Sequence, residues 1–427
     1  MTTPDHDRAT ITVLGAGYVG LAAAACLADL GHYVRCIDIN PEHIELLADG
    51  RFASSEIGLT ELILKGAAKG LLSFETPTPH SDVSDADFVF VCLPTPASAD
   101  GSADLSLVFA ALHQRRSAFK PAAIVVLKST MPPNSNRECA QRLDRADVHI
   151  VSNPEFLREG RTVYDFMNPD RIVVGSDDLD SGSRVVDLYV GLPGERIVTD
   201  SVTAELIKYA SNAYLAMRLS FVNSLANLST ALGSNTNELL RGVGSDRRIG
   251  DDYLRPGPGW GGSCLPKDTR ALLHVAESRG VAFDLVRTAI DQNTNQMRDV
   301  VDRVLSMNDG TAEGMVVAIW GLAFKSGTAD VRDSPSLVII DHLIRHGAHI
   351  RVNDPHITDV SPEIANIECM YEVCRDADAL LVLTDSDEYR AADLHEVRSM
   401  LRNPVLIDTK HLFEAAQLRE AGFWEVG

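Results

Sequence analysis

The fold of the chain is decided by one stretch, Ile11-Thr12-Val13-Leu14-Gly15-Ala16-Gly17-Tyr18-Val19-Gly20. Its first part is apolar and partly β-branched, as in a short buried strand. The glycines follow with the spacing G-x-G-x-x-G, and the Ala- and Leu-rich run at 21–30 predicts a helix that ends near Gly31. A second strand is expected at 33–39, and it contains Asp38, 18 residues after Gly20.

This order of strand, glycine turn, helix and acid is the context of a dinucleotide-binding fingerprint. Gly15 is expected to make the tight turn, Gly17 to let a pyrophosphate approach the backbone, and Gly20 to let helix and strand pack closely. Asp38 should accept hydrogen bonds from ribose hydroxyls, which favours NAD over NADP. A purely structural glycine turn would leave this acid unexplained. The predicted cofactor segment comprises Gly15, Gly17, Tyr18, Val19, Gly20 and Asp38.

Three further strands are expected at 88–93, 124–127 and 148–152, and polar residues follow each of them. In open α/β sheets, ligands bind outside the carboxyl ends of the strands. Thr95, Thr130 and the segment Glu155–Glu159 are therefore expected to converge with Gly15 on one crevice. Taken singly, each Thr or Glu could equally be a helix cap or a solvated loop residue.

Residues 201–232 contain neither Pro nor Gly and predict one long helix, which either links two domains or forms the core of a dimer. On it, Lys208 and Asn212 are four residues apart and share a face. A second α/β pattern starts at 315 but has no G-x-G-x-x-G. Lys325, in the turn after its first strand, is either a phosphate contact or an ordinary surface lysine.

The stretch 257–268 is rich in Gly and Pro and runs into another expected helix, because Pro266 suits a first helical turn. Cys264 would then lie near the positive end of the helix dipole, which favours the thiolate form. Asp268 follows one turn later on the same side. The alternatives are a nucleophile with a carboxylate nearby and a structural cysteine at a loop-to-helix junction.

The composition limits the function classes. The 427 residues suggest two or three domains, and the net charge of −21 argues against nucleic acid as a partner. No apolar run is long enough for a membrane span, and the first ten residues lack the apolar core of a signal peptide. The seven cysteines are scattered without metal-ligand spacing. We therefore expect no metal site, no membrane insertion and a cytoplasmic location.

Five motifs resemble the nucleotide-sugar 6-dehydrogenases, the UDP-glucose/GDP-mannose dehydrogenase family. They are GAGYVG at 15–20, NPEFLREG at 153–160, ELIKYASNAYLAMRLSFVN at 205–223, GPGWGGSCLPKD at 257–268 and GLAFKSGTADVRDSP at 321–335. The segment 165–171 and the helix from Lys208 are most similar to the branch that acts on UDP-glucose. The resemblance covers nearly the whole chain.

The resemblance implies an α/β fold with two Rossmann-like domains joined by a long central helix and a helical dimerisation region. The expected parts are an NAD-binding domain at 1–200, a central helical region with the cysteine at 201–310, and a UDP-sugar-binding domain at 311–427. A homodimer or a higher homo-oligomer is implied as well.

The activity that the resemblance implies is NAD-dependent four-electron oxidation of the C6 alcohol of UDP-glucose to UDP-glucuronate. Cys264 would carry the thiohemiacetal and the thioester. Lys208 and Asn212 would stabilise the oxyanion, and Lys208 is also a candidate proton acceptor. Asp268, with Thr130 and Glu159 through water, would handle proton transfer, and the base of the first oxidation stays open. The alternatives are another nucleotide sugar (UDP-galactose, a UDP-N-acetyl sugar or GDP-mannose) and a non-catalytic NAD-sensing protein.

Further site residues follow from the resemblance by position. The expected NAD contacts beyond the fingerprint are Thr95, Thr130, Glu159, Lys267 and Arg332. The expected substrate contacts are Glu155, Phe156, Leu157, Arg158, Glu159, Lys208, Asn212, Arg248 (with Arg247 as an alternative), Tyr253, Leu254, Arg255, Pro256, Gly257, Gly261 and Lys325. The chain departs from the family pattern at His43, Ile57, Trp260 and Ala329, where relatives commonly have Lys or Arg, Pro, Phe and Asp.

Overall fold

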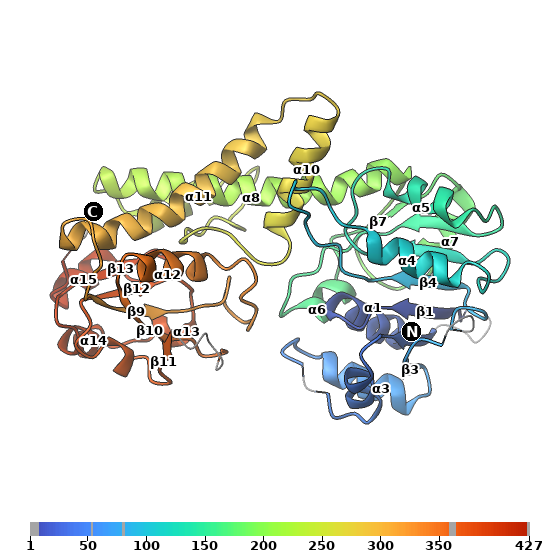
Figure 1. Cartoon of the computed structure of the whole chain (residues 1–427), viewed down its shortest axis with the longest axis horizontal. Helices are drawn as coiled ribbons and strands as arrows, with labels where there is room; N and C mark the ends of the chain where they lie inside the picture. The colour runs from blue at the N-terminus through green and yellow to red at the C-terminus, as the bar shows by residue number, and fades with distance from the viewer. Residues whose placement is uncertain (1–7, 53, 79–81, 358–363, 425–427) are drawn as a thin grey trace. The chain divides into compact units, whose positions relative to one another are not determined.

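A computed structural model describes residues 8–52, 54–78, 82–357 and 364–424 (Figure 1). The chain forms two compact units. The first consists of Met1–Ser211 and Arg270–Arg279, and the second of Asn212–Thr269 and Gly280–Gly427. None of the helices among the described residues is long and apolar enough to cross a membrane. The expectation about the signal peptide rests largely on residues 1–7, which lie outside the described part.

The first unit contains an eight-stranded sheet in the order β3-β2-β1-β4-β5-β6-β7-β8. All its strand pairs are parallel except β6 with β7. Since β1 lies between β2 and β4, the strand order reverses there, and such a reversal opens a ligand crevice at the carboxyl ends. The strands are β1 (Thr10–Leu14), β2 (Tyr33–Ile37), β3 (Leu72–Glu75), β4 (Phe88–Val91), β5 (Ile124–Leu127), β6 (His149–Ser152), β7 (Arg171–Gly175) and β8 (Glu195–Thr199).

Helices cover both faces of this sheet because its strands are apolar on both sides. One face packs against α1, α3, α6 and α7, and the other against α4 and α5. The helices of this part are α1 (Tyr18–Asp29), α2 (Pro41–Ala48), α3 (Leu59–Ala68), α4 (Ser106–Arg115), α5 (Ser135–Leu143), α6 (Thr162–Met167) and α7 (Leu179–Asp187).

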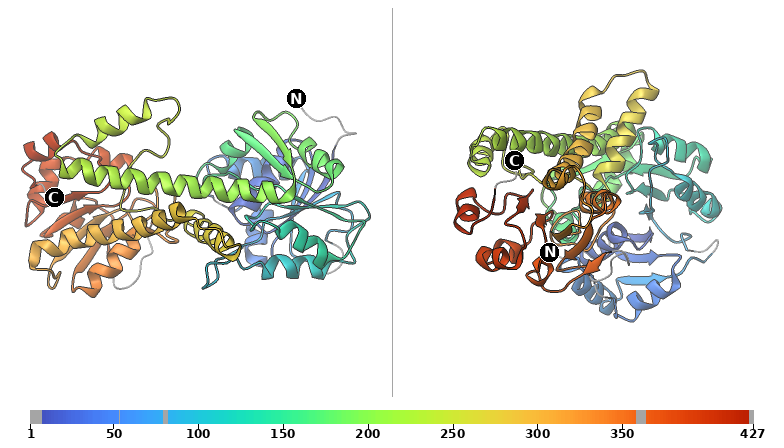
Figure 2. Two further views of the ribbon diagram at one scale, coloured as in Figure 1. Left: turned by 90° about the horizontal axis from the view of Figure 1, so that it is seen from above. Right: turned by 60° about the vertical axis from the view of Figure 1, so that its left-hand side comes forward.

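The long helix is α8 (Ser201–Ala231), which runs without a break from the first unit into the second (Figure 2). It starts where the Asp200 carboxylate accepts the N–H of Thr203, at 2.9 Å. The helix predicted at 201–232 is confirmed. From the sequence, the polar stretch 191–200 is expected to be a break before this helix, but in the structure it contains β8.

The second unit contains a parallel five-stranded sheet in the order β11-β10-β9-β12-β13. Its strands are β9 (Val316–Trp320), β10 (His349–Asn353), β11 (Ala365–Asn366), β12 (Ala379–Val382) and β13 (Leu406–Asp408). Its face toward α11 and α12 is aliphatic, while the other face packs Trp320 flat on Tyr389, with ring centroids 4.9 Å apart. The predicted α/β fold with two Rossmann-like sheets and a long central helix is confirmed.

Seven helices and two 3-10 turns follow α8 in the described part of the chain. The sequence also predicts helical segments at 236–243, 269–279 and 284–307, and a helix is present at each of these places. The helix α10 starts directly after Cys264 and has Pro266 in its first turn, as the stretch 257–268 predicts. The elements are α9 (Thr236–Gly244), α10 (Leu265–Ser278), α11 (Asp284–Leu305), η2 (Ser306–Asn308), α12 (Pro335–Arg345), η3 (Glu372–Cys374), α13 (Asp387–Arg390), α14 (Leu394–Met400) and α15 (Ala415–Glu420).

Candidate active site

The glycine turn after β1 has the geometry that its spacing predicts. Gly15 has φ +100°, and a Cβ there would lie 2.6 Å from the carbonyl oxygen of Cys92. A Cβ on Gly20 would lie 1.9 Å from the carbonyl oxygen of Gly15. A Cβ on Gly17, in contrast, would meet nothing within 4 Å. The N-terminus of α1 therefore has open space beside it for an anionic group.

Asp38 lies beside this turn at the end of β2. Its carboxylate accepts the N–H of Ala16 at 2.8 Å and that of Asn40 at 3.0 Å. The imidazole Nε2 of His43 lies 3.1 Å from the carbonyl oxygen of Ala16, and its ring meets Phe52 edge-on. The turn, the helix end and the fixed acid fit the pyrophosphate and ribose of a dinucleotide.

The loops after β4 and β5 are tied together. The hydroxyl of Thr95 donates to the carbonyl oxygen of Thr130 at 2.8 Å, and the hydroxyl of Ser129 donates to that of Leu93 at 2.6 Å. Both threonines are buried. The structure thus brings the two predicted threonines together at the carboxyl edge of the first sheet.

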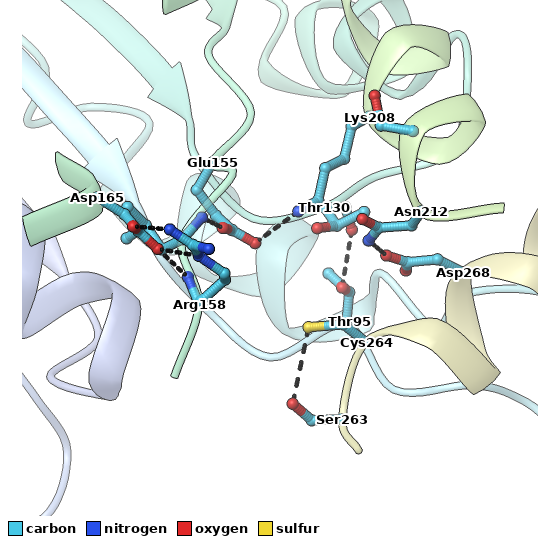
Figure 3. Close-up of polar contacts among 12 residues, drawn as sticks. Thr95, Thr130, Glu155, Arg158, Asp165, Lys208, Asn212, Ser263, Cys264 and Asp268 are labelled. Carbon is cyan, nitrogen blue, oxygen red and sulfur yellow. Dashed lines mark hydrogen bonds and ion pairs between the residues drawn. The ribbon is translucent and has the colours of Figure 1, made fainter. Parts of the chain in front are cut away.

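Glu155 and Lys208 form a buried ion pair with Nζ 2.9 Å from Oε1 (Figure 3). Burial opposes the charge of Glu155, but the ammonium of Lys208 and the N–H of Leu157 outweigh it and lower the pKa of this carboxyl. The ring of Phe156 lies 4.0 Å from the guanidinium carbon of Arg171 and 5.4 Å from Nζ of Lys208. Lys208 is therefore no ordinary surface lysine.

The segment that follows Glu155 is held by Glu56, which sequence reasoning missed. The buried carboxylate of Glu56 accepts the N–H groups of Gly160 (2.8 Å) and Thr162 (3.0 Å) and the Thr162 hydroxyl (2.8 Å). Glu56 belongs to the family pattern Glu56-Ile57-Gly58-Leu59, which could have indicated it, but only the departure at Ile57 was considered. Arg158 pairs with Asp165 and is exposed, while Glu159 is half-buried.

Cys264 directly precedes α10 in the second unit, and its carbonyl accepts the N–H of Asp268 at 3.0 Å. Its thiol is partly exposed and lies 3.7 Å from the hydroxyl of Ser263. Five of the six other cysteines are buried, and Cys369 is exposed. A partly exposed thiol at a helix N-terminus is the arrangement expected of a reactive cysteine.

Asp268 is fully buried and has two partners, of which Figure 3 shows Asn212. Its Oδ2 accepts the amide of Asn212 at 2.6 Å, and its Oδ1 pairs with the ammonium of Lys267. Asn212 lies one turn after Lys208 on α8. The carboxylate therefore fixes which way the Asn212 amide points.

The glycines before Cys264 make room for the chain itself. A Cβ on Gly261 would lie 2.0 Å from the carbonyl oxygen of Asp333, and one on Gly262, at φ +83°, would lie 2.7 Å from the ring of Phe324. The N–H of Gly262 donates to the carbonyl of Arg332 at 3.1 Å. Two motifs that are distant in sequence, 257–268 and 321–335, thus pack against each other within the second unit.

The other predicted residues of the second unit are spread more widely. Lys325 lines a cavity of about 350 Å³ with Asp354 and Thr384. Tyr253 adopts φ +58°, a strained value that is typical of functional loops. Leu254, Pro256 and Gly257 are buried. Three arginines are exposed. Arg248 pairs with Asp246 and Arg332 with Asp330, each two residues away, whereas Arg255 lies 4.0 Å from the distant Asp385.

Sequence reasoning also missed Lys410. Its ammonium lies 3.2 Å from where a Cβ on Gly257 would stand and 3.8 Å from Asp385. Burial lowers the pKa of this lysine, although Asp385 and Asp408 favour its charge. The available signal was its place just after β13, at the carboxyl edge of the second sheet. Within the described ranges, no three His, Cys, Asp or Glu side chains gather as a metal site would require.

Three family models match nearly the whole chain. The model of the UDP-glucose/GDP-mannose dehydrogenase family, NAD binding domain, matches residues 9–192. Those of the family's central domain and UDP binding domain match residues 202–295 and 318–415. A UDP-glucose 6-dehydrogenase of Rhizobium meliloti (strain 1021) is 39% identical over 97% of this chain and 98% of its own length.

Two solved structures extend the comparison. A UDP-glucose dehydrogenase from the archaeon Pyrobaculum islandicum has a TM-score of 0.91 at 33% identity and covers 100% of this chain and 99% of its own. A UDP-D-ManNAc dehydrogenase from Pyrococcus horikoshii has a TM-score of 0.86 at 25% identity and covers 95% and 96%. Both similarities extend over the two units and the long helix.

Proposed function

The chain belongs to the UDP-glucose/GDP-mannose dehydrogenase family, and from this membership we propose that it oxidises the C6 alcohol of UDP-glucose to the carboxylate of UDP-glucuronate. It is an NAD-dependent oxidoreductase. The observation that carries the specific proposal is Cys264, a partly exposed thiol at the start of α10, next to the Asn212–Asp268 pair.

The cofactor would be held by the fingerprint residues. Gly17 leaves room for the pyrophosphate at the N-terminus of α1, and Asp38 would accept hydrogen bonds from the ribose. Thr95, Thr130, Glu159, Lys267 and Arg332 are proposed as further contacts. When bound, NAD⁺ accepts a hydride from the substrate carbon in each of the two oxidations.

Cys264 would join the two oxidations. After the alcohol has lost a hydride and a proton, the thiolate adds to the aldehyde carbon and forms a thiohemiacetal. Loss of a second hydride and of the hydroxyl proton gives a thioester. Water then attacks this thioester, releasing the carboxylate and regenerating the thiol. A thiolate suits both steps, because it is nucleophilic and also a fair leaving group.

The neighbouring groups have matching roles in this proposal. Lys208 and Asn212 would donate hydrogen bonds to the oxyanion that develops at the substrate carbon. Asp268 keeps the Asn212 amide oriented and, with Thr130 and Glu159 through water, would move protons during oxidation and hydrolysis. The base of the first oxidation is Lys208 or one of these carboxylates.

The nucleotide sugar would be held by residues of several motifs. We assign the sugar and diphosphate to Glu155–Glu159 and to the loop 253–257 with Gly261, and the uridine diphosphate to Lys325. Arg248 is a further proposed contact. In this scheme the NAD domain spans 1–200, the central region 201–310 and the UDP-sugar domain 311–427. A cytoplasmic location remains a prediction from the cysteine pattern.

The stoichiometry of the reaction tests this function. The purified protein, given limiting UDP-glucose and excess NAD⁺, should form two NADH per sugar and UDP-glucuronate as product. One NADH per sugar with a free aldehyde would contradict the four-electron reaction. A parallel panel of UDP-galactose, UDP-N-acetylmannosamine and GDP-mannose, compared by kcat/KM, distinguishes another nucleotide sugar. Binding of NAD⁺ without turnover of any sugar would indicate a sensing role.

The nucleophile is tested by replacing Cys264 with serine. The variant should form the acid roughly 1,000-fold more slowly or worse. The serine alkoxide is a poorer leaving group than a thiolate, and the serine hydroxyl is rarely ionised. NAD⁺ binding, followed by fluorescence quenching, should be unchanged. Cys369→Ser serves as the matched control and should keep full activity. Normal acid formation by the Cys264 variant would rule out a covalent role for this residue.

A further inference from the structure

One buried amine of the first unit has no role in the reaction described above. Lys128 directly follows β5, and its ammonium lies 3.0 Å from Oδ1 of Asn153 and 3.4 Å from the hydroxyl of Tyr189. It also faces the rings of Phe166 and Tyr189, with centroids 5.8 and 5.6 Å away. Both hydrogen-bond partners are neutral. A charged lysine in such surroundings loses much hydration, so it calls for an explanation.

The charged and titratable groups around Lys128 come from several elements. Glu155, which follows β6, favours the positive charge of Lys128, whereas Lys208 of α8 opposes it. The third titratable group is the thiol of Cys92, which directly follows β4. Burial lowers the pKa of Lys128 to about 8, and it raises the pKa of the Cys92 thiol to about 12. Near neutral pH, two ammonium groups therefore act on a single carboxylate, Glu155.

A second connection runs through Asn153. Its Oδ1 accepts from both Lys128 and Tyr189, and its Nδ2 donates to the carbonyl of Val173 at 2.8 Å. The amide is thus held on every side. Only Pro154, with its restricted φ, separates it from Glu155. A chain of contacts thus leads from Lys128 through Asn153 and Pro154 to Glu155, the residue that pairs with Lys208.

We propose that Lys128 is a positioning residue for the Glu155–Lys208 pair, acting through Asn153 on the place of Glu155 and through its positive charge on the ionisation of both partners. This inference rests on the proposed function in one respect, namely that Lys208 acts in the reaction. Lys128 itself is not assigned any contact with substrate or cofactor.

The pH dependence of kcat is the first test, with Lys128→Met as the variant. Removing a cation makes it easier for every neighbouring group to hold a proton. Each ionisation of this cluster that governs kcat should therefore move to higher pH, by about one unit, whichever partner is the base. Lys128→Arg retains the charge and should restore most of the wild-type profile. Lys69→Met removes an exposed lysine of the same unit and should leave the profile unchanged.

A second test needs no catalysis. Thermal midpoints are measured for wild type, Lys128→Met, Glu155→Gln and the double variant. If the lysine acts on Glu155, the two substitutions shift the midpoint non-additively. Because the folded-state pKa of Lys128 lies below its usual value of 10.5, wild type should also gain stability relative to Lys128→Met as pH rises from about 8 to about 10.5.

The two tests separate the proposal from the function on which it rests. The positioning role would be overturned if the two substitutions had additive effects on the thermal midpoint. It would also be overturned if Lys128→Met left the pH profile of kcat in place or moved it to lower pH. A lower midpoint with an unchanged profile would show a merely structural lysine and would overturn it as well. If wild type oxidises no nucleotide sugar, the proposed function is wrong. The comparison of thermal midpoints among wild type, the single variants and the double variant still decides whether Lys128 acts on Glu155.

Discussion

Glu205 lies three residues before Lys208 on α8 and caps another helix of the same unit. Its carboxylate accepts the N–H groups of Asn134 (2.7 Å) and Asn136 (2.8 Å) at the start of α5, and the hydroxyl of Ser152 at 3.1 Å. Burial raises the pKa of Glu205 to about 7 even though these donors favour the charged form. A single residue therefore links the loop after Thr130 to α8 in a way that depends on pH.

The raised pKa predicts how stability changes with pH. Between about pH 4.5 and 7 the folded protein binds more protons at Glu205 than the unfolded chain. The contribution of this group, on the order of 3 kcal/mol, is thus present below pH 4.5 and is lost as pH rises to 7. Glu205→Gln should flatten this part of the curve of thermal midpoint against pH. Glu138→Gln, at a half-buried position of α5, is the control, and an equal slope in both variants would contradict the prediction.

Individual residues also show what the sequence can predict. Lys208 and Asn212 were found because helical spacing places them on one face, and Asp268 because it lies one turn after Cys264. Glu56 and Lys410 were not found, because their partners are contributed by segments far away in the sequence. Local spacing contains no information on such contacts. The sequence offered only the position of Glu56 in a glycine-containing pattern and that of Lys410 after a strand.

At the level of elements, periodicity worked best where an element is long or buried. The helix at 201–232 and the strand at 124–127 are present almost as predicted. The strand β8 was missed because it is an edge strand that pairs only with β7 among the described strands, and its residues are exposed or half-buried. Without a buried face, no apolar alternation marks it in the sequence.

The loop before Cys264 is fastened to two helices of the second unit. The indole N–H of Trp260 donates to the hydroxyl of Ser220 on α8 at 2.9 Å, and this hydroxyl donates to the carbonyl of Ala289 on α11 at 2.8 Å. Asn293 of α11 bonds both the N–H (2.7 Å) and the C=O (2.9 Å) of Trp260. The departure from Phe at this position thus adds a hydrogen bond that Phe cannot make.

This contact predicts a coupled pair. Trp260→Phe and Ser220→Ala should each destabilise the protein, the hydrogen bond accounting for roughly 1 kcal/mol. The double variant should lose less than the sum, because both substitutions remove the same bond. The midpoints of urea unfolding give the stability of wild type, the two single variants and the double variant. The rate of Cys264 alkylation shows whether the loop before this cysteine has loosened. Ser224→Ala, whose hydroxyl bonds only within α8, is the control. Fully additive effects would show that the bond contributes nothing.

On the scale of the whole molecule, the proposed catalytic groups belong to both compact units. Thr130, Glu159 and Lys208 belong to the first, whereas Asn212, Cys264 and Asp268 belong to the second. The boundary falls within α8, between Ser211 and Asn212. Domain limits read from sequence rest on changes in composition and on Pro or Gly, and none of these occurs inside an unbroken helix.

The long helix also has an unusual surface. Tyr214, Phe221 and Leu228 follow one another at intervals of seven residues on α8, and they are 62%, 61% and 54% exposed. A seven-residue repeat puts them on one stripe of the helix, as in helices that pair with another helix. Large apolar side chains gathered in this way mark an interaction surface. We propose that a second copy of the chain covers this stripe.

Substituting the stripe tests the dimer. Tyr214→Asp combined with Phe221→Asp would bury two unpaired carboxylates at the interface, at a cost of several kcal/mol, roughly 3 or more, in the free energy of association. Light scattering after gel filtration should show the wild type as a dimer or a larger oligomer, and the double variant should have a smaller mass at the same concentration. Leu179→Asp, at an exposed apolar position of α7, should leave the mass unchanged. A wild-type monomer, or a double variant of unaltered mass, would mean that α8 does not carry the contact between subunits.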